Sequence, residues 1–126
     1  MLFVRLYSKL SQGFQRMTIH ITPEIARAAY ELLRTTLPFH RWKLYHADDI
    51  WFICRPMKSC LGSYVPGKVP KLYIDTNRHG SLDRLIVTLA HEMCHMRGPL
   101  THGKDFKKLV ASVCRYHNFD MKEMCD

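Results

Sequence analysis

The chain has 126 residues, a length that suits one domain built around a single hydrophobic core. Its hydrophobic content of 47% and charged content of 24% are typical of globular proteins and argue against general disorder, and its formal net charge is +8. No apolar run is long enough for a membrane-spanning helix, and the five cysteines form no CxxC pair, so we expect neither a membrane anchor nor a disulfide framework. A reducing, cytoplasmic compartment fits this cysteine usage best.

The first 17 residues are expected to be an N-terminal extension, and the domain proper is expected to cover residues 18–126. The extension contains no Asp or Glu. Apolar residues recur in it at helical spacing: Phe3, Leu6, Leu10 and Phe14. A short helix and a transit peptide both remain open for this segment.

A helix is predicted to follow Thr22, because Thr22 can cap it, Pro23 suits its first position and Pro38 would end it. Two short strand-like runs, at residues 42–45 and 50–54, are separated by a polar segment and predict a hairpin.

Residues 55–70 are rich in Gly and Pro and predict a loop, which leads to a third strand, "KLYID", at 71–75. Residues 82–97 predict a second long helix, with Ser81 as its cap and Gly98 at its end.

The helix at 82–97 carries the sequence HEMCH, in which polar side chains lie beside an apolar arc. His91 and His95 are four residues apart, so their imidazoles can converge on one Zn²⁺. Glu92 points to the side of the two ligands, where it can act as a general base toward a water that the metal activates. Two histidine ligands with a glutamate base between them in sequence are the HExxH motif of zinc peptidases.

A third ligand is required, and His102 is the next histidine that can fold back after the helix ends. Asp83 and Asp105 are the alternatives.

Tyr64 and Tyr116 are candidates for an oxyanion-stabilising hydroxyl. The remaining histidines lack ligand spacing and are expected on the surface or in loops: His20, His40, His46, His79 and His117. Cys94 lies within the motif but rotates away from the histidine arc, and a structural thiol is expected there.

The last predicted helix covers about residues 103–116 and has two faces. Its apolar face is expected to be buried, and the opposite face is basic: Lys104, Lys107, Lys108 and Arg115. This basic face is interpreted either as a contact for nucleic-acid phosphates or an acidic partner, or as a solvated surface without a partner. No aromatic side chains are interleaved with these lysines, as stacking on nucleic-acid bases would require.

These motifs resemble those of known metallopeptidases. HEMCH followed by "HGKDF" is similar to the HExxH and HGxxF pattern of the SprT-like zinc metallopeptidases, and "MKSCLGSY" is similar to a loop of the related YgjP-like enzymes. The resemblance covers about residues 40–113. It implies an α+β, zincin-like fold with Zn²⁺ on His91, His95 and His102 and with Glu92 as base. It also implies that a substrate peptide lies along "KLYID" as an edge strand.

The expected architecture is therefore a short, mostly antiparallel sheet packed on the helix that carries HEMCH, with helices at both ends of the domain. The predicted function is a monomeric zinc endopeptidase that cleaves protein or peptide substrates, including DNA-associated proteins. The alternative is a non-catalytic nucleic-acid-binding module in which zinc only stabilises the fold.

Overall fold

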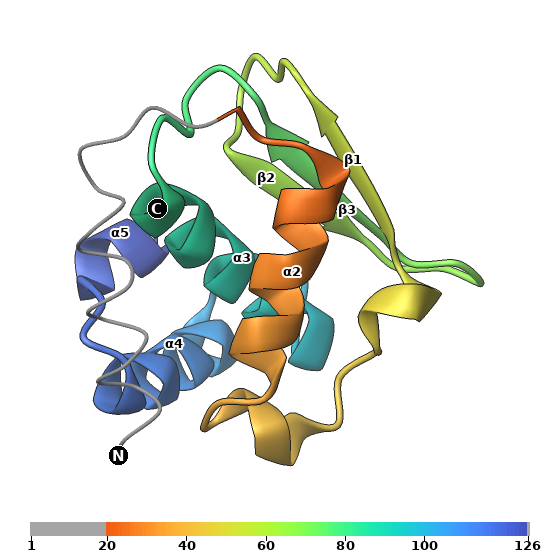
Figure 1. Ribbon diagram of the computed structural model, residues 1–126. Helices are drawn as coiled ribbons and strands as arrows, with labels where there is room; N and C mark the ends of the chain where they lie inside the picture. The colour runs from red at the N-terminus through yellow and green to blue at the C-terminus, as the bar shows by residue number, and fades with distance from the viewer. Residues whose placement is uncertain (1–19, 126) are drawn as a thin grey trace.

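Four helices and a three-stranded sheet are found in residues 20–125, the part of the chain that the computed structural model describes (Figure 1). The elements in chain order are α2 (Pro23–Arg34), the 3₁₀ helices η1 (Phe39–Trp42) and η2 (Ala47–Asp49), β1 (Trp51–Arg55), β2 (Gly62–Val65), β3 (Lys71–Asp75), α3 (Leu82–Arg97), α4 (Lys104–Tyr116) and α5 (Met121–Cys125). The domain is a small α+β domain, as predicted. The predicted extension at residues 1–17 lies outside the described residues.

The two long helices begin at the caps that the sequence predicts. The Thr22 side chain accepts a hydrogen bond from the main-chain N–H of Ile25 at 3.2 Å, and the Ser81 side chain accepts one from Arg84 at 3.3 Å. Each cap satisfies one of the main-chain donors that a helix start leaves unpaired. None of the helices described here is long and apolar enough to cross a membrane.

The sheet is mixed, whereas the sequence predicts a mostly antiparallel sheet. Its strand order is β1-β3-β2, with β1 parallel to β3 and β2 antiparallel to β3. The predicted hairpin is wrong, because residues 42–45 form the end of η1 and a loop, and β1 pairs with β3 instead. Strand β2 falls within the predicted loop at 55–70, where the Gly and Pro residues conceal a strand of only four residues.

The central position of β3 overturns one expectation that rests on the family resemblance. "KLYID" is paired on both sides, so it presents no free edge to a substrate peptide. Strand β2 is an edge strand, and it lies against α3 at Gly62. A Cβ at Gly62 would lie 2.9 Å from Thr88 Cγ2 and 3.1 Å from the carbonyl oxygen of Tyr73, so this close approach requires glycine.

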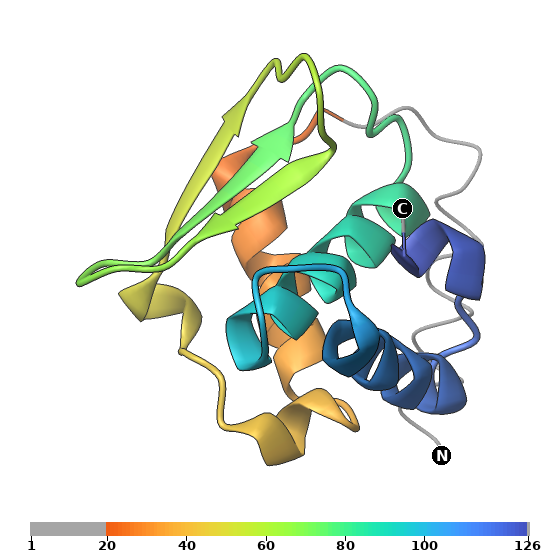
Figure 2. The same ribbon diagram turned by 180° about the vertical axis from the view of Figure 1, so that it is seen from behind.

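The helices lie together on one side of the sheet (Figure 2). Helix α2 contacts β1 and α3 contacts β2, while α4 and α5 pack on α3 farther from the sheet. The core between these layers contains Tyr30, Leu33, Leu72, Leu89 and Phe106, each almost fully buried. Helix α3 is therefore held on several sides, which fixes the side chains along it.

Two histidines that were expected on the surface or in loops are in loops but buried. His79 is 1% exposed and His117 is 2% exposed. The ring of His117 lies against Phe119 at a centroid distance of 5.1 Å and against Phe39 at 5.8 Å. Burial lowers the pKa of His117 to about 4, so this imidazole is neutral in the folded protein at neutral pH.

This burial predicts a contribution of His117 to acid unfolding. The pKa of a histidine in an unfolded chain is about 6.5, so stability should fall as the pH drops from about 6.5 to about 4. In the variant His117→Phe, the loss of unfolding free energy between pH 7 and pH 4 should be smaller than in the wild type by about 2–3 kcal/mol. Urea titrations of the metal-free proteins at several pH values measure this free energy of unfolding. His20→Gln, at an exposed position, is the control and should follow the wild type; a parallel curve for His117→Phe would contradict the assignment.

Candidate metal centre

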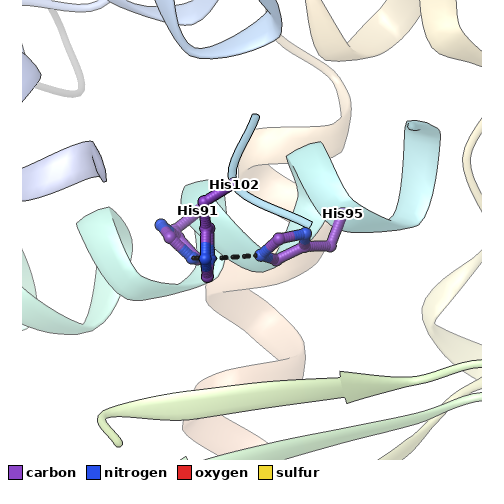
Figure 3. Close-up of side chains that lie close together, drawn as sticks. All are labelled: His91, His95 and His102. Atoms are coloured by element: carbon purple, nitrogen blue, oxygen red, sulfur yellow. Dashed lines mark hydrogen bonds between the residues drawn. The ribbon is translucent and has the colours of Figure 1, made fainter. Parts of the chain in front are cut away.

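Three imidazole rings converge at the C-terminal half of α3 (Figure 3). The Nε2 atom of His102 lies 3.2 Å from that of His91 and 2.9 Å from that of His95. All three potential ligand atoms lie within 4.8 Å of one another. The structure therefore brings together the three predicted metal-ligating residues in a group that could hold a metal ion. Asp83 and Asp105, the alternative third ligands, are not part of this group.

The outer nitrogens of the two helix histidines are bound to main-chain carbonyls. His91 Nδ1 lies 2.5 Å from the carbonyl oxygen of Met124, and His95 Nδ1 lies 3.0 Å from that of Pro99. A carbonyl oxygen only accepts hydrogen bonds, so Nδ1 is the donor in both rings. In the neutral state each Nε2 then carries a lone pair, and both lone pairs are directed toward His102.

This arrangement has the chemistry of a cation site. The Nε2 atom of His102 carries at most one proton, so it can donate a hydrogen bond to only one of the two facing Nε2 atoms. In the other contact two acceptor nitrogens face each other, which is unfavourable unless a cation lies between them. Burial lowers the pKa of His91 and that of His95, which keeps both rings in the neutral form that binds metal. In a tetrahedral zinc site with bonds of about 2.0–2.1 Å, neighbouring ligand atoms are roughly 3.3 Å apart, close to the two distances between His102 and the other rings.

The segment between α3 and α4 positions two of the three ligands. It supplies His102 itself, and the Pro99 carbonyl in the same segment orients His95. Gly98 lies directly against α4 in this turn, because a Cβ there would lie only 2.5 Å from Leu109 Cδ1 and the Leu109 side chain would have to move. A short connection that packs tightly on α4 thus brings His102 back over α3.

Phe106 supports all three imidazoles from below the cluster. Its ring centroid lies 4.3 Å from that of His95 in a stacked arrangement, and 5.0 Å from those of His91 and His102. The side chain is fully buried at the start of α4. The phenylalanine of "HGKDF" therefore limits the ring orientations of the ligands, a contact that helical spacing alone does not reveal.

The C-terminal helix α5 contributes a part of the site that the sequence did not predict. Its Met124 carbonyl orients His91, and the Met124 side chain is fully buried. The helix has only five residues, and a main-chain carbonyl has no residue type that would mark it. Only the packing of α5 on α3 and α4 shows its role.

Glu92 lies beside the histidines on the side that faces β2. It is 4% exposed, and the main chain of Tyr64 on β2 lies near enough to its carboxylate to lower the pKa of Glu92. Burial has the larger effect and raises the pKa of Glu92 to about 7. A small cavity of about 50 Å³ lies next to it, lined in part by His91, Glu92 and Gly62.

The other sequence-based candidates lie apart from this centre. Neither Tyr64 nor Tyr116 is among the residues that line the cavity with their side chains. Cys94 is buried and is outside the histidine group, in agreement with a structural thiol. The basic residues of α4 are all exposed: Lys104, Lys107, Lys108 and Arg115.

No protein-family model matches the chain, and no curated protein or solved structure was found to match it. The interpretation of the site therefore depends on its own geometry.

The convergence of the three rings predicts stoichiometric metal binding. The purified protein should hold about one zinc per chain, and His91→Ala, His95→Ala and His102→Ala should each sharply weaken it, because two imidazoles form only part of a zinc site. Metal analysis after dialysis and competition with a chromophoric chelator measure this effect. Exposed His20→Ala is the control. Full zinc occupancy in His102→Ala would contradict the third-ligand assignment.

The hydrogen bond from His91 to α5 predicts that this short helix tunes metal affinity. Met124→Ala removes the buried side chain that holds α5, so zinc affinity should fall by about 10- to 100-fold, the usual effect of losing an outer hydrogen-bond partner of a metal-bound histidine. Met121→Ala, on the exposed side of the same helix, is the matched control and should bind zinc as the wild type does. Equal affinities for the two variants would show that α5 does not orient His91.

Proposed function

We propose that the protein is a zinc-dependent endopeptidase of the SprT-like type. The observation that carries this proposal is the convergence of three Nε2 atoms with an acidic side chain, Glu92, next to them but outside the group. Within residues 20–125 that group has three members, which leaves one position of a four-coordinate metal for water or substrate. Catalytic zinc sites have this composition, whereas structural zinc sites close the fourth position with a protein ligand.

The donor set supports zinc as the metal. Three neutral imidazoles without thiolates are a common ligand set for catalytic zinc. When bound, zinc would polarise the carbonyl of a scissile bond and acidify a water molecule. Everything else in the reaction depends on side chains of this chain.

Glu92 is proposed as the general base. Its carboxylate is buried and lines the same cavity as His91, so it can take a proton from the attacking water and later give it to the leaving amine. Its environment disfavours the charged form, which makes the carboxylate a better proton acceptor once it is ionised.

We propose that the substrate peptide binds along β2. The resemblance implied β3 instead, which has no free edge. It is an edge strand, and its close approach to α3 at Gly62 brings its main chain next to the cavity beside Glu92. A peptide added to this edge would form main-chain hydrogen bonds that do not depend on its sequence. Such binding suits a peptidase that acts on extended segments of protein substrates. That these substrates include DNA-associated proteins is a prediction from the family resemblance.

Glu92→Gln tests the catalytic proposal. The amide has nearly the same shape as the carboxylate but cannot accept the proton, so peptide hydrolysis should fall by several orders of magnitude while zinc content and the unfolding transition stay unchanged. Cleavage of an unfolded, fluorescently labelled protein measures the rate. Glu92→Asp, which keeps the carboxylate at a shorter reach, should retain more activity than Glu92→Gln.

The same experiment distinguishes the non-catalytic alternative. A zinc-stabilised nucleic-acid-binding module has no need for a base beside the metal. If the wild type and Glu92→Gln both fail to cleave unfolded substrates while holding one zinc each, the endopeptidase proposal is wrong and the structural role of zinc is favoured.

A further inference from the structure

A second hollow lies beside α3, away from the histidine cluster. It is an open groove of about 670 Å³ between the last turn of α2, the segment that carries η1 and η2, and the last two residues of α3. Both overall views show this segment passing beside the C-terminal end of α3 (Figures 1 and 2). None of the three candidate metal ligands lines the groove, so it is a separate site.

The groove is lined by cations from three different elements. Arg34 comes from the end of α2, Lys43 from the loop after η1, and Arg97 from the end of α3. Asp49 is the one carboxylate that lines it within residues 20–125. Arg34 also binds Glu31 at 2.8 Å, whereas Lys43 and Arg97 are exposed and form no ion pair with any described residue. The charge of the groove therefore suits a polyanion.

Two aromatic residues line the same groove as these cations. Tyr45 is 46% exposed, and Trp42 is partly buried, with its ring held edge-on against Phe39 at a centroid distance of 5.2 Å. Along the chain they alternate with basic residues in the stretch "HRWKLYH" at 40–46. Basic and aromatic side chains that alternate in one groove are typical of surfaces that bind single-stranded nucleic acids, because bases stack on the rings while cations contact phosphates.

The segment that carries these residues is tied to the core. The hydroxyl of Tyr30, a fully buried residue, donates a hydrogen bond to the main-chain carbonyl of Tyr45. The Glu31 carboxylate accepts a hydrogen bond from the main-chain N–H of Ala47 at 2.7 Å. The groove is thus held in place without a ligand, which reduces the entropy cost of binding.

Lys43 has a backbone conformation that lysine rarely adopts. Its φ of 54° and ψ of 49° lie in the left-handed region, which favours Gly or Asn. Lys43 follows the last residue of η1, where a left-handed residue ends the helix and turns the chain, and this turn places Lys43 in the lining of the groove.

We propose that this groove binds single-stranded nucleic acid, with Lys43, Arg97 and Arg34 at the phosphates and with bases stacked on Tyr45 and Trp42. The site is independent of metal binding and of peptide hydrolysis. It differs from the basic face of α4, whose four cations are exposed without aromatic side chains among them.

The test uses the full-length, metal-loaded protein and a labelled oligothymidine of roughly 12 nucleotides, with binding measured by fluorescence anisotropy at several salt concentrations. Lys43→Asn combined with Arg97→Gln should weaken binding and reduce the slope of log K against log salt by about 1.4, the value for two lost phosphate contacts on a single strand. Tyr45→Ala should weaken binding by about 5- to 100-fold, and Tyr45→Phe should restore it.

Three controls separate binding from folding, from overall charge and from catalysis. Asn accepts the left-handed backbone, so Lys43→Asn should not lower the unfolding temperature, and Lys43→Arg should keep binding. Lys104→Gln combined with Lys107→Gln removes the same charge from α4 and should change the affinity much less than the groove variant does. Glu92→Gln should bind as the wild type does, so failure of the peptidase proposal would leave this result intact.

Several outcomes would overturn the proposal. They are absence of oligothymidine binding at low salt, equal losses for the α4 and groove variants, an unchanged affinity for Tyr45→Ala, and equal competition by an acidic polyglutamate peptide of the same charge. The last outcome would make an acidic protein segment the partner of the groove. Comparison of oligothymidine with oligouridine then decides between DNA and RNA, either of which supports the proposal.

Discussion

Two hydrogen bonds from imidazoles to main-chain carbonyls determine the character of the site. They hold the Nδ1 protons of His91 and His95, and therefore direct both Nε2 lone pairs to the point where His102 also arrives. The carbonyl partners fix the tautomer and the orientation of each ring, as metal ligation requires, while burial of the two rings lowers their pKa and favours the neutral form. Without them the rings could rotate or exchange tautomers, and the HExxH spacing would not by itself produce a set of converging ligands.

Other parts of the domain position these two carbonyls and surround Glu92. The turn at Gly98 brings Pro99 and His102 back over α3, and the packing of Met124 brings the C-terminal helix to His91. From the other side, β2 approaches α3 closely at Gly62, and a Cβ at this position would lie 3.5 Å from Glu92 Cγ. His91, His95 and Glu92 thus lie on one helix, His102 comes from the segment that follows it, and different parts of the chain surround these side chains. The same helix ends at Arg97, which lines the second groove, so peptide hydrolysis and polyanion binding would take place on two sides of α3.

The sequence was a good guide where the information is local. The caps at Thr22 and Ser81, the limits of α3 and the trio His91, Glu92 and His95 depend on periodicity and on residues within a few positions of one another. His102 was predicted because few residues can fold back after a helix stop, and the structure confirms its place beside the other two rings. The α+β class, which the family resemblance implied, is the class of the observed fold.

The errors concern pairing between distant segments and contacts made by the main chain. Strand β2 was missed because its flanking Gly and Pro residues are typical of a loop. Gly62 within it packs against Thr88 on α3, and periodicity within the strand cannot reveal such a contact between distant segments. The run at 42–45 resembles a strand, but Lys43 turns the chain and leaves Trp42 and Tyr45 at the groove. The carbonyl of Met124 has no signature in the sequence, because every residue has a carbonyl.

X-ray absorption spectroscopy at the zinc edge of the purified, zinc-loaded protein tests the central claim most directly. The account predicts three imidazole nitrogens and one further light atom at about 2.0–2.1 Å, with loss of one imidazole in His102→Ala. Sulfur scattering near 2.3 Å, or a first shell that is the same in His102→Ala, would contradict a three-histidine centre with an open position.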